Sequence, residues 1–262
     1  MIPYAKPLLS NWVLRISGPL VVLFVWELAT HVGGIDPIFL PAPSTIMATF
    51  IKLLLSGELL SHALSSLGRL SVGYGIAALV GISLGLLVGW FRIFNEFFTP
   101  LIELTRPISP IALIPLAILW FGIGWQSKVF VIAMGTFFPI LINTIAGVRN
   151  TDSLMIRAAR ALGAGEMQIL RTVVIPSAAP FIHTGLRISL SIGFIVIIAS
   201  EMVAAQNGLG WLVLDAQRLY RTDVVFVGIV SVSCLGLLCD YGMRKLGEIL
   251  FPWLKAREVK HV

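Results

Sequence analysis

Six long apolar runs dominate this chain of 262 residues and leave it few ways to fold. They cover approximately residues 16–32, 70–90, 108–123, 129–148, 181–200 and 224–241. A membrane-spanning helix needs about 20 mostly apolar residues. Only 12% of the residues are charged, about half the usual share of a soluble domain. The sequence therefore predicts an all-α integral membrane protein with six transmembrane helices, and excludes disordered, fibrous and disulfide-rich secreted classes.

The placement of Lys and Arg predicts the orientation of these spans. If the N-terminus lies inside, fourteen of the nineteen basic residues fall in inner segments, among them Arg92 and Arg106, while Lys128 falls outside. Cytoplasmic segments carry this excess, so we expect both termini in the cytoplasm. The net charge of +6 is read as the same bias, because no basic cluster interleaved with aromatic residues indicates nucleic-acid binding.

The segment between the first two runs predicts an interfacial helix. Ser44 or Thr45 is placed to cap it. A helical apolar stripe follows, formed by Met47, Phe50, Ile51, Leu54 and Leu55, and such a helix fits the outer membrane interface. A second short helical piece, residues 59–69, is expected to lead into the second span.

Two patterns in the spans concern packing and the transport path. The second span carries a small residue at every fourth position, namely Gly73, Ala77, Gly81, Gly85 and Gly89. Such a stripe lets a neighbouring backbone approach closely, so we favour helix packing over a role in permeation.

The segment from Pro100 to Pro115 is apolar but contains four prolines, Pro100, Pro107, Pro110 and Pro115, ahead of residues 116–122. Broken backbone at membrane depth is tolerated where it is buried in protein or lines a wet cavity. The third span is therefore either a cavity wall, with Ser109 near its break, or a kink that only shapes packing.

Four ionisable residues lie within or at the ends of spans: Glu27, Arg187, Glu201 and Asp240. Such residues carry a functional hypothesis by default. The alternative for Glu27 is a structural hydrogen bond. Glu201 and Asp240 have the alternative of reaching the interface, and Arg187 that of extending to lipid phosphates.

The longest inner loop, residues 150–180, has helical spacing. Asp152 is placed to cap a helix through residue 161, Gly163 to Gly165 break it, and a second helix over residues 166–174 ends at Pro176. One apolar face gathers Leu154, Ala158, Ala161 and Leu162. Two short helices joined by a glycine corner form a knob that suits docking into a groove on a partner.

This loop resembles the EAA loop of ABC importer permeases. The motif reads Glu-Ala-Ala, three residues, Gly, nine residues and Ile-x-Leu-Pro, and Ala158, Ala159, Gly163 and Pro176 match it at the right spacing. Arg157 stands where the motif has Glu, so the carboxylate of the motif is missing here, and Gly165 stands where the family often has Ser.

Further matches resemble the sulfonate/taurine/nitrate branch, in particular its aliphatic-sulfonate permeases. They are Leu40 to Ser44, Leu113 to Pro115, Trp120 to Gly124, Lys128, Phe138-Pro139, Glu201 and Gly208 to Gly210.

The resemblance implies the type I ABC importer permease fold, in the bacterial inner membrane. It implies a homodimer that works with two cytoplasmic ATPase subunits and a periplasmic or lipid-anchored substrate-binding protein. ATP and Mg would be bound by the ATPase, so we expect no cofactor, metal or catalytic residue in this chain, and it has no phosphate-binding Gly-x-x-x-x-Gly-Lys-Ser/Thr loop. The expected divisions are residues 1–69 (tail, first span and interfacial helix), 70–248 (permease core) and 249–262 (cytoplasmic tail).

Two sets of site residues are expected. The ATPase-docking loop comprises Arg157, Ala158, Ala159, Leu162, Gly163, Ala164, Gly165, Ile175 and Pro176. Candidates for the translocation path are Ser109, Asn143, Thr144, Arg187, Ser189, Ser191 and Glu201, although such polar residues also serve as hydrogen bonds between helices.

The expected substrate is a small oxyanion, with taurine or another alkanesulfonate favoured over nitrate, bicarbonate or an aromatic acid. Two distant alternatives are a self-sufficient channel or secondary carrier, against which the docking loop argues, and an intramembrane enzyme. The latter needs a nucleophile and a base in contact, and none of His31, His62, His183 or His261 lies deep in a span.

Overall fold

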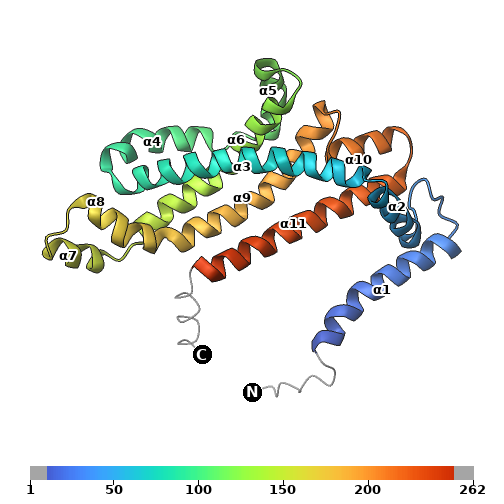
Figure 1. Ribbon diagram of the computed structural model, residues 1–262, viewed down its shortest axis with the longest axis horizontal. Coiled ribbons are helices and arrows are strands. Elements are labelled where there is room, and N and C mark those ends of the chain that lie inside the picture. The colour runs from blue at the N-terminus through green and yellow to red at the C-terminus, as the bar shows by residue number, and fades with distance from the viewer. Residues whose placement is uncertain (1–10, 251–262) are drawn as a thin grey trace. The chain divides into compact units, whose positions relative to one another are not determined.

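A computed structural model describes residues 11–250, which form helices and connecting turns without a strand (Figure 1). Residues 1–10 and most of the expected tail 249–262 lie outside the described residues. The described residues divide into two units, one of residues 11–61 with Leu212–Val230 and one of His62–Trp211 with residues 231–250. The elements in chain order are α1 (Asn11–Val32), α2 (Pro43–Leu55), α3 (Glu58–Trp90), α4 (Arg92–Thr105), η1 (Ile111–Leu113), α5 (Ile114–Phe121), α6 (Trp125–Arg149), α7 (Ser153–Ala161), α8 (Glu166–Ile169), the π-helical turn η2 (Leu170–Val174), α9 (Ile175–Ala204), α10 (Leu209–Arg218) and α11 (Thr222–Leu250).

Four helical stretches are each long and apolar enough to cross a membrane: α3, α6, the run from α8 through α9, and α11. The helix before the second span differs from its expectation. Residues 59–69 do not form a separate piece but belong to α3, which runs unbroken for 33 residues. This stretch contains no proline, the residue that most strongly interrupts a helix.

The second unit is built around α6, which packs between α3 and α9 (Figure 1). The small-residue stripe of α3 forms the first contact. A methyl group added at Gly85 would lie 2.6 Å from the Thr144 Cβ, and one at Gly89 would lie 2.7 Å from the Val148 Cβ. The stripe therefore packs α3 onto α6 within one chain, as predicted. On its other side, α6 places Gly147 against Phe181 of α9.

The third expected span, residues 108–123, is wrong in its extent. Its helical part, η1 with α5, covers only Ile111–Phe121 and is too short to cross a bilayer. We infer that the crossing begins earlier, with α4, because its Asn95 accepts a hydrogen bond from Arg149 at the end of α6 (2.6 Å). It is interrupted between Arg106 and Pro110, where Pro107 and Pro110 lack the backbone N–H that a continuous helix needs.

The break lies near the mid-height of α6. Pro110 packs against Gly135, so that a Cβ on this glycine would lie 3.3 Å from Pro110. Gly135 is ten residues from the start of the 25-residue α6, or about 15 Å along a helix of about 37 Å. Arg106, expected in an inner loop, therefore lies at the break of an interrupted crossing. In the part of the chain that the structure describes, α1 and this crossing join the four long stretches as candidate spans, and only those four are long and apolar enough by themselves.

The loop helix at residues 166–174 also differs from its expectation. It does not end at Pro176 but passes through the π-helical turn η2 into α9, which begins at Ile175. Pro176 sits in the first turn of α9. A proline has no backbone N–H, so Pro176 cannot donate the helical hydrogen bond to the carbonyl of Thr172, four positions earlier. Thr172 lies in the π turn, where backbone hydrogen bonds join residues five positions apart instead of four.

In the first unit, Glu27 of α1 holds the start of α2. Its carboxylate accepts hydrogen bonds from the Ser44 backbone N–H (3.0 Å) and hydroxyl (2.7 Å). The predicted cap is therefore wrong, because α2 begins at Pro43 with Ala42 as its N-cap, and Ser44 turns its hydroxyl to Glu27. Proline at the first helical position has the backbone angle that a helix requires. The structural interpretation of Glu27 is confirmed.

Candidate functional site: an exposed loop and a buried polar cluster

The loop between α6 and α9 projects at one end of the layer formed by α3, α6 and α9 (Figure 1). Asp152 caps α7, as predicted, by accepting a hydrogen bond from the Leu154 backbone N–H (2.8 Å). Gly163 then turns the chain with φ +82°, a conformation that favours glycine. At this corner the Leu162 side chain is 88% exposed. A leucine presented in this way contributes nothing to the core of the chain.

The inner side of the loop is anchored on an apolar cluster. Its buried members are Val148, Ile169, Leu170, Val174 and Ala178, with Ala159 and Ala164 packed against them. The outer side is hollowed into a groove of about 860 Å³. Its lining comes from α7 with the corner that follows it, from η2 and from the start of α9, and includes Met155, Ala158, Leu162, Val173 and Pro176. The loop is thus held by the buried apolar cluster on one side and presents an open apolar groove on the other.

The charges on this loop are mostly positive. Arg160 pairs with Glu166 across the glycine corner at 2.9 Å, and both side chains are more than half exposed. Arg157 and Arg171 are exposed as well. Arg157 makes no ion pair with residues 11–250 of its own chain, so its guanidinium is available to a partner.

A second polar site is buried in the same unit, where α3 meets the end of α9. Glu201 has no exposed surface, and its carboxylate lies 2.6 Å from the Arg69 guanidinium. It also accepts hydrogen bonds from the Ser66 hydroxyl and the Gly210 backbone N–H, both at 2.9 Å. Arg69 in turn donates to the backbone and side-chain oxygens of Asn207. Glu201 therefore lies in a buried network and has no exposed surface with which to reach the membrane interface.

Glycines make this network possible. Gly208 has φ +117°, and a Cβ there would lie 2.4 Å from the Glu201 carboxyl group. Its backbone N–H donates to His62 Nδ1 (3.1 Å), and the His62 ring lies against Trp211. The Gly208-Leu209-Gly210 sequence thus bends the chain tightly over the carboxylate.

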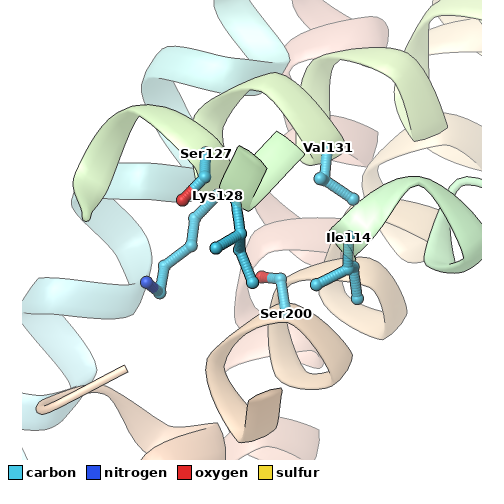
Figure 2. A pocket seen from close by; sticks show the side chains of 6 residues that line it. Ile114, Ser127, Lys128, Val131 and Ser200 are labelled. Atoms are coloured by element: carbon cyan, nitrogen blue, oxygen red, sulfur yellow. The ribbon is translucent and has the colours of Figure 1, made fainter. Parts of the chain in front are cut away.

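Figure 2 shows the neighbouring cavity, where Lys128 and Ser127 of α6 lie close to Ser200 of α9. The Lys128 ammonium points away from Ile114 and Val131 and donates to the Gly124 carbonyl at 2.9 Å. The cavity is too narrow for a water molecule. These polar groups therefore belong to packed structure in this conformation.

The candidate path residues do not converge on one site. Thr144 and Ser189 are buried, and each donates to a carbonyl of its own helix. Ser109 and Ser191 are exposed, and Asn143 is half-buried and donates to the Pro139 carbonyl. Arg187 pairs with Asp240 at 2.8 Å, so its charge is compensated. Their role in transport stays a prediction.

Comparison with known proteins fits this architecture. Residues 77–247 match the family described as "Binding-protein-dependent transport system inner membrane component". The chain belongs to this family of permeases. Relatives of the permease include a putative ABC transporter permease protein of Methanocaldococcus jannaschii, 40% identical over 93% of this chain and 92% of that protein. The taurine transport system permease protein of Escherichia coli is 36% identical over 94% of this chain and 92% of its own length.

The permease also resembles solved structures. A chain of the MetNI methionine ABC transporter, described as inward facing, superposes with a TM-score of 0.64 at 22% identity, covering 72% of this chain and 94% of that one. This likeness shows the type I ABC importer permease fold. The family match and the long apolar helices together make the permease a multi-pass inner-membrane transport protein.

Sequence reasoning missed half of the buried cluster. It singled out Glu201 and the Gly208-Leu209-Gly210 turn but gave no role to Ser66, Arg69 or Asn207. The available signal was Arg69 itself, a charged residue at the edge of an apolar run and so in need of a partner.

Proposed function

We propose that this permease forms the translocation path of an ATP-driven importer for a small oxyanion, with taurine or another alkanesulfonate as the favoured substrate. It does so as one of two identical copies, with a separate ATPase subunit docked on the α7–α8 loop of each. A substrate-binding protein delivers the anion on the opposite side of the membrane. The chain itself contributes no ATP chemistry.

The exposed Leu162 corner carries the coupling part of this proposal. Leu162 is 88% exposed beside an apolar groove, and a partner that covers this surface is favoured, because burial of apolar surface drives association. The anchored inner side supports transmission of movement, because displacement of α7 and α8 acts through Ile169 and Val174 on α9. The basic residues around the corner favour an acidic rim on the partner.

The oxyanion part rests on the relatives. The Escherichia coli relative is named for taurine transport, and the sequence resembles a branch whose other members carry nitrate, bicarbonate or aromatic acids. The alternative substrates, namely nitrate, bicarbonate or an aromatic acid, would be carried by the same assembly of permease, ATPase and binding protein.

The coupling is tested with Leu162→Ser in the transporter assembled from the permease, its ATPase and its binding protein. We expect loss of ATPase co-purification and at least a tenfold drop in ATP-driven uptake, while the folded permease is recovered in normal yield. Leu219→Ser is the matched control, since Leu219 is also exposed (60%) but lies outside the loop. Equal ATPase binding by both variants would contradict the docking proposal.

A further inference from the structure

The interrupted crossing brings a basic side chain into a groove near the mid-height of α6. Arg106 follows directly on α4 and is exposed, and it lines a groove with Pro110 of the break and Gly135 of α6. The groove lies near the mid-height of α6, because Pro110 packs on Gly135 there. α6 is one of the stretches long and apolar enough to cross a membrane, and a side chain at the mid-height of such a helix is at the depth of the hydrocarbon.

The groove has the size and the composition of a small-ligand site. Its volume is about 400 Å³, within the range of ligand pockets. The remaining lining includes Met134, Phe138, Asn143 and Ile192, so the walls are apolar except for one amide. None of its lining residues is acidic.

Arg106 also lacks a counter-charge. Within residues 11–250 it takes part in no ion pair. The nearest acidic residue along the chain, Glu103, lies one turn earlier on α4 and does not line the groove. Charged side chains inside a membrane are costly and pair with one another or face a water-filled pathway, and interrupted helices at the midplane of transporters form substrate sites.

We propose that the groove at the α4–η1 break is an anion subsite of the translocation path, in which the Arg106 guanidinium holds the substrate's anionic group in transit. The proposal rests on the proposed import of an oxyanion and assigns its charge recognition to one residue. A planar guanidinium donates two parallel hydrogen bonds to an oxyanion such as a sulfonate. The apolar walls accept the rest of a small organic anion, and an open groove with a single charge permits release.

The test uses charge restoration at one position. Cys234 and Cys239 are replaced by serine, and Arg106→Cys is introduced in the transporter assembled with its ATPase and binding protein in proteoliposomes. Uptake of radiolabelled taurine is measured before and after treatment with three thiosulfonates, which attach a cationic, an anionic or a neutral group.

We expect Arg106→Cys to lower uptake at least tenfold and the cationic reagent to restore it to at least a third of the parental rate. The anionic and neutral reagents restore nothing, and basal ATP hydrolysis and ATPase co-purification stay within twofold. Arg92→Cys is the matched control. Arg92 lies at the start of the same helix, on the surface, where it pairs with Glu96, and we expect its uptake to stay within twofold under every treatment.

The outcomes separate the two proposals. The subsite proposal is contradicted if the parental transporter imports taurine and the Arg106→Cys variant imports it at a rate within twofold of the parental rate. It is also contradicted if the neutral reagent restores uptake as well as the cationic one. In both cases the proposed import function is unaffected. If the parental transporter accumulates neither taurine nor nitrate, bicarbonate or benzoate, the proposed function fails and the subsite fails with it.

Discussion

The Glu201 carboxylate and the Arg69 guanidinium lie 2.6 Å apart, in a place where Glu201 has no exposed surface. The pair joins α9 to α3 across 132 positions of sequence. The carboxylate is further satisfied by Ser66 and by the Gly210 backbone. This network fixes the turn between α9 and α10, so its loss has consequences for both helices.

Removing one charge of this pair is expected to destabilise the permease strongly. Glu201→Gln keeps the shape but leaves Arg69 as an uncompensated buried charge, and breaking such pairs costs about 3–5 kcal/mol. The free energy of unfolding, measured in mixed micelles by denaturing detergent, checks this. The double variant Arg69→Met, Glu201→Leu is expected to recover much of the loss, because no charge is left buried. If the double variant lost as much unfolding free energy as the two single variants together, this account of the ion pair would be contradicted.

Gly208 is expected to tolerate no side chain. Gly208→Ala combines a strained positive φ with a Cβ 2.4 Å from the Glu201 carboxyl group, so the turn must shift and the network opens. We expect a lower unfolding temperature and faster amide exchange at residues 207–211. Gly68→Ala in α3, where a Cβ meets nothing within 4 Å, is the control and is expected to be neutral or slightly stabilising. Equal effects of the two substitutions would be incompatible with the observed geometry.

The glycine stripe of α3 predicts a one-sided pattern of sensitivity. Gly85→Ala places a methyl group 2.6 Å from the Thr144 Cβ, and overpacking of this kind costs about 1–3 kcal/mol. Gly75→Ala, on the open side of the same helix, is expected to cost nothing. Thermal unfolding of the two purified variants makes the comparison, and a Gly75 variant as unstable as the Gly85 variant would argue against the packing of α3 on α6.

Arg157 predicts a salt-dependent contact with the ATPase. It is exposed and takes no ion-pair partner within residues 11–250, and a surface pair contributes about 0.2–1 kcal/mol. Arg157→Glu replaces such an attraction with a repulsion, so we expect the affinity for the ATPase to fall by about twofold to tenfold at low salt. Raising the ionic strength is expected to shrink the difference. A titration of ATPase stimulation at two salt concentrations measures it, and a difference that is independent of salt would exclude the electrostatic explanation.

Local sequence signals predicted the parts of the fold that depend on local physics. The four-residue spacing of small side chains from Gly73 to Gly89 predicted close helix packing, and α6 fills that contact. Asp152 and Gly163 marked a helix start and a helix end, because capping and left-handed backbone depend on one residue each. The first helix of the exposed loop and its glycine corner were therefore predictable, whereas the continuation of the second helix into α9 was not.

The interrupted crossing and the buried cluster were not predictable in this way. A search for continuous apolar runs finds residues 108–123, but α4 carries Arg92, Glu96 and Glu103 on one side and so hides its place in the crossing. The partner of Glu201 lies 132 residues away, and no local pattern connects them. Both features depend on which segments meet in three dimensions.

ATP-dependent accumulation of radiolabelled taurine in proteoliposomes tests the central claim most directly. The permease, reconstituted with its ATPase and supplied with its binding protein, is expected to concentrate taurine only when ATP is present on the loop side. The permease reconstituted alone is expected to show no uptake above empty vesicles. Uptake by the permease alone, at the rate of the complete assembly and without ATP, would contradict the account.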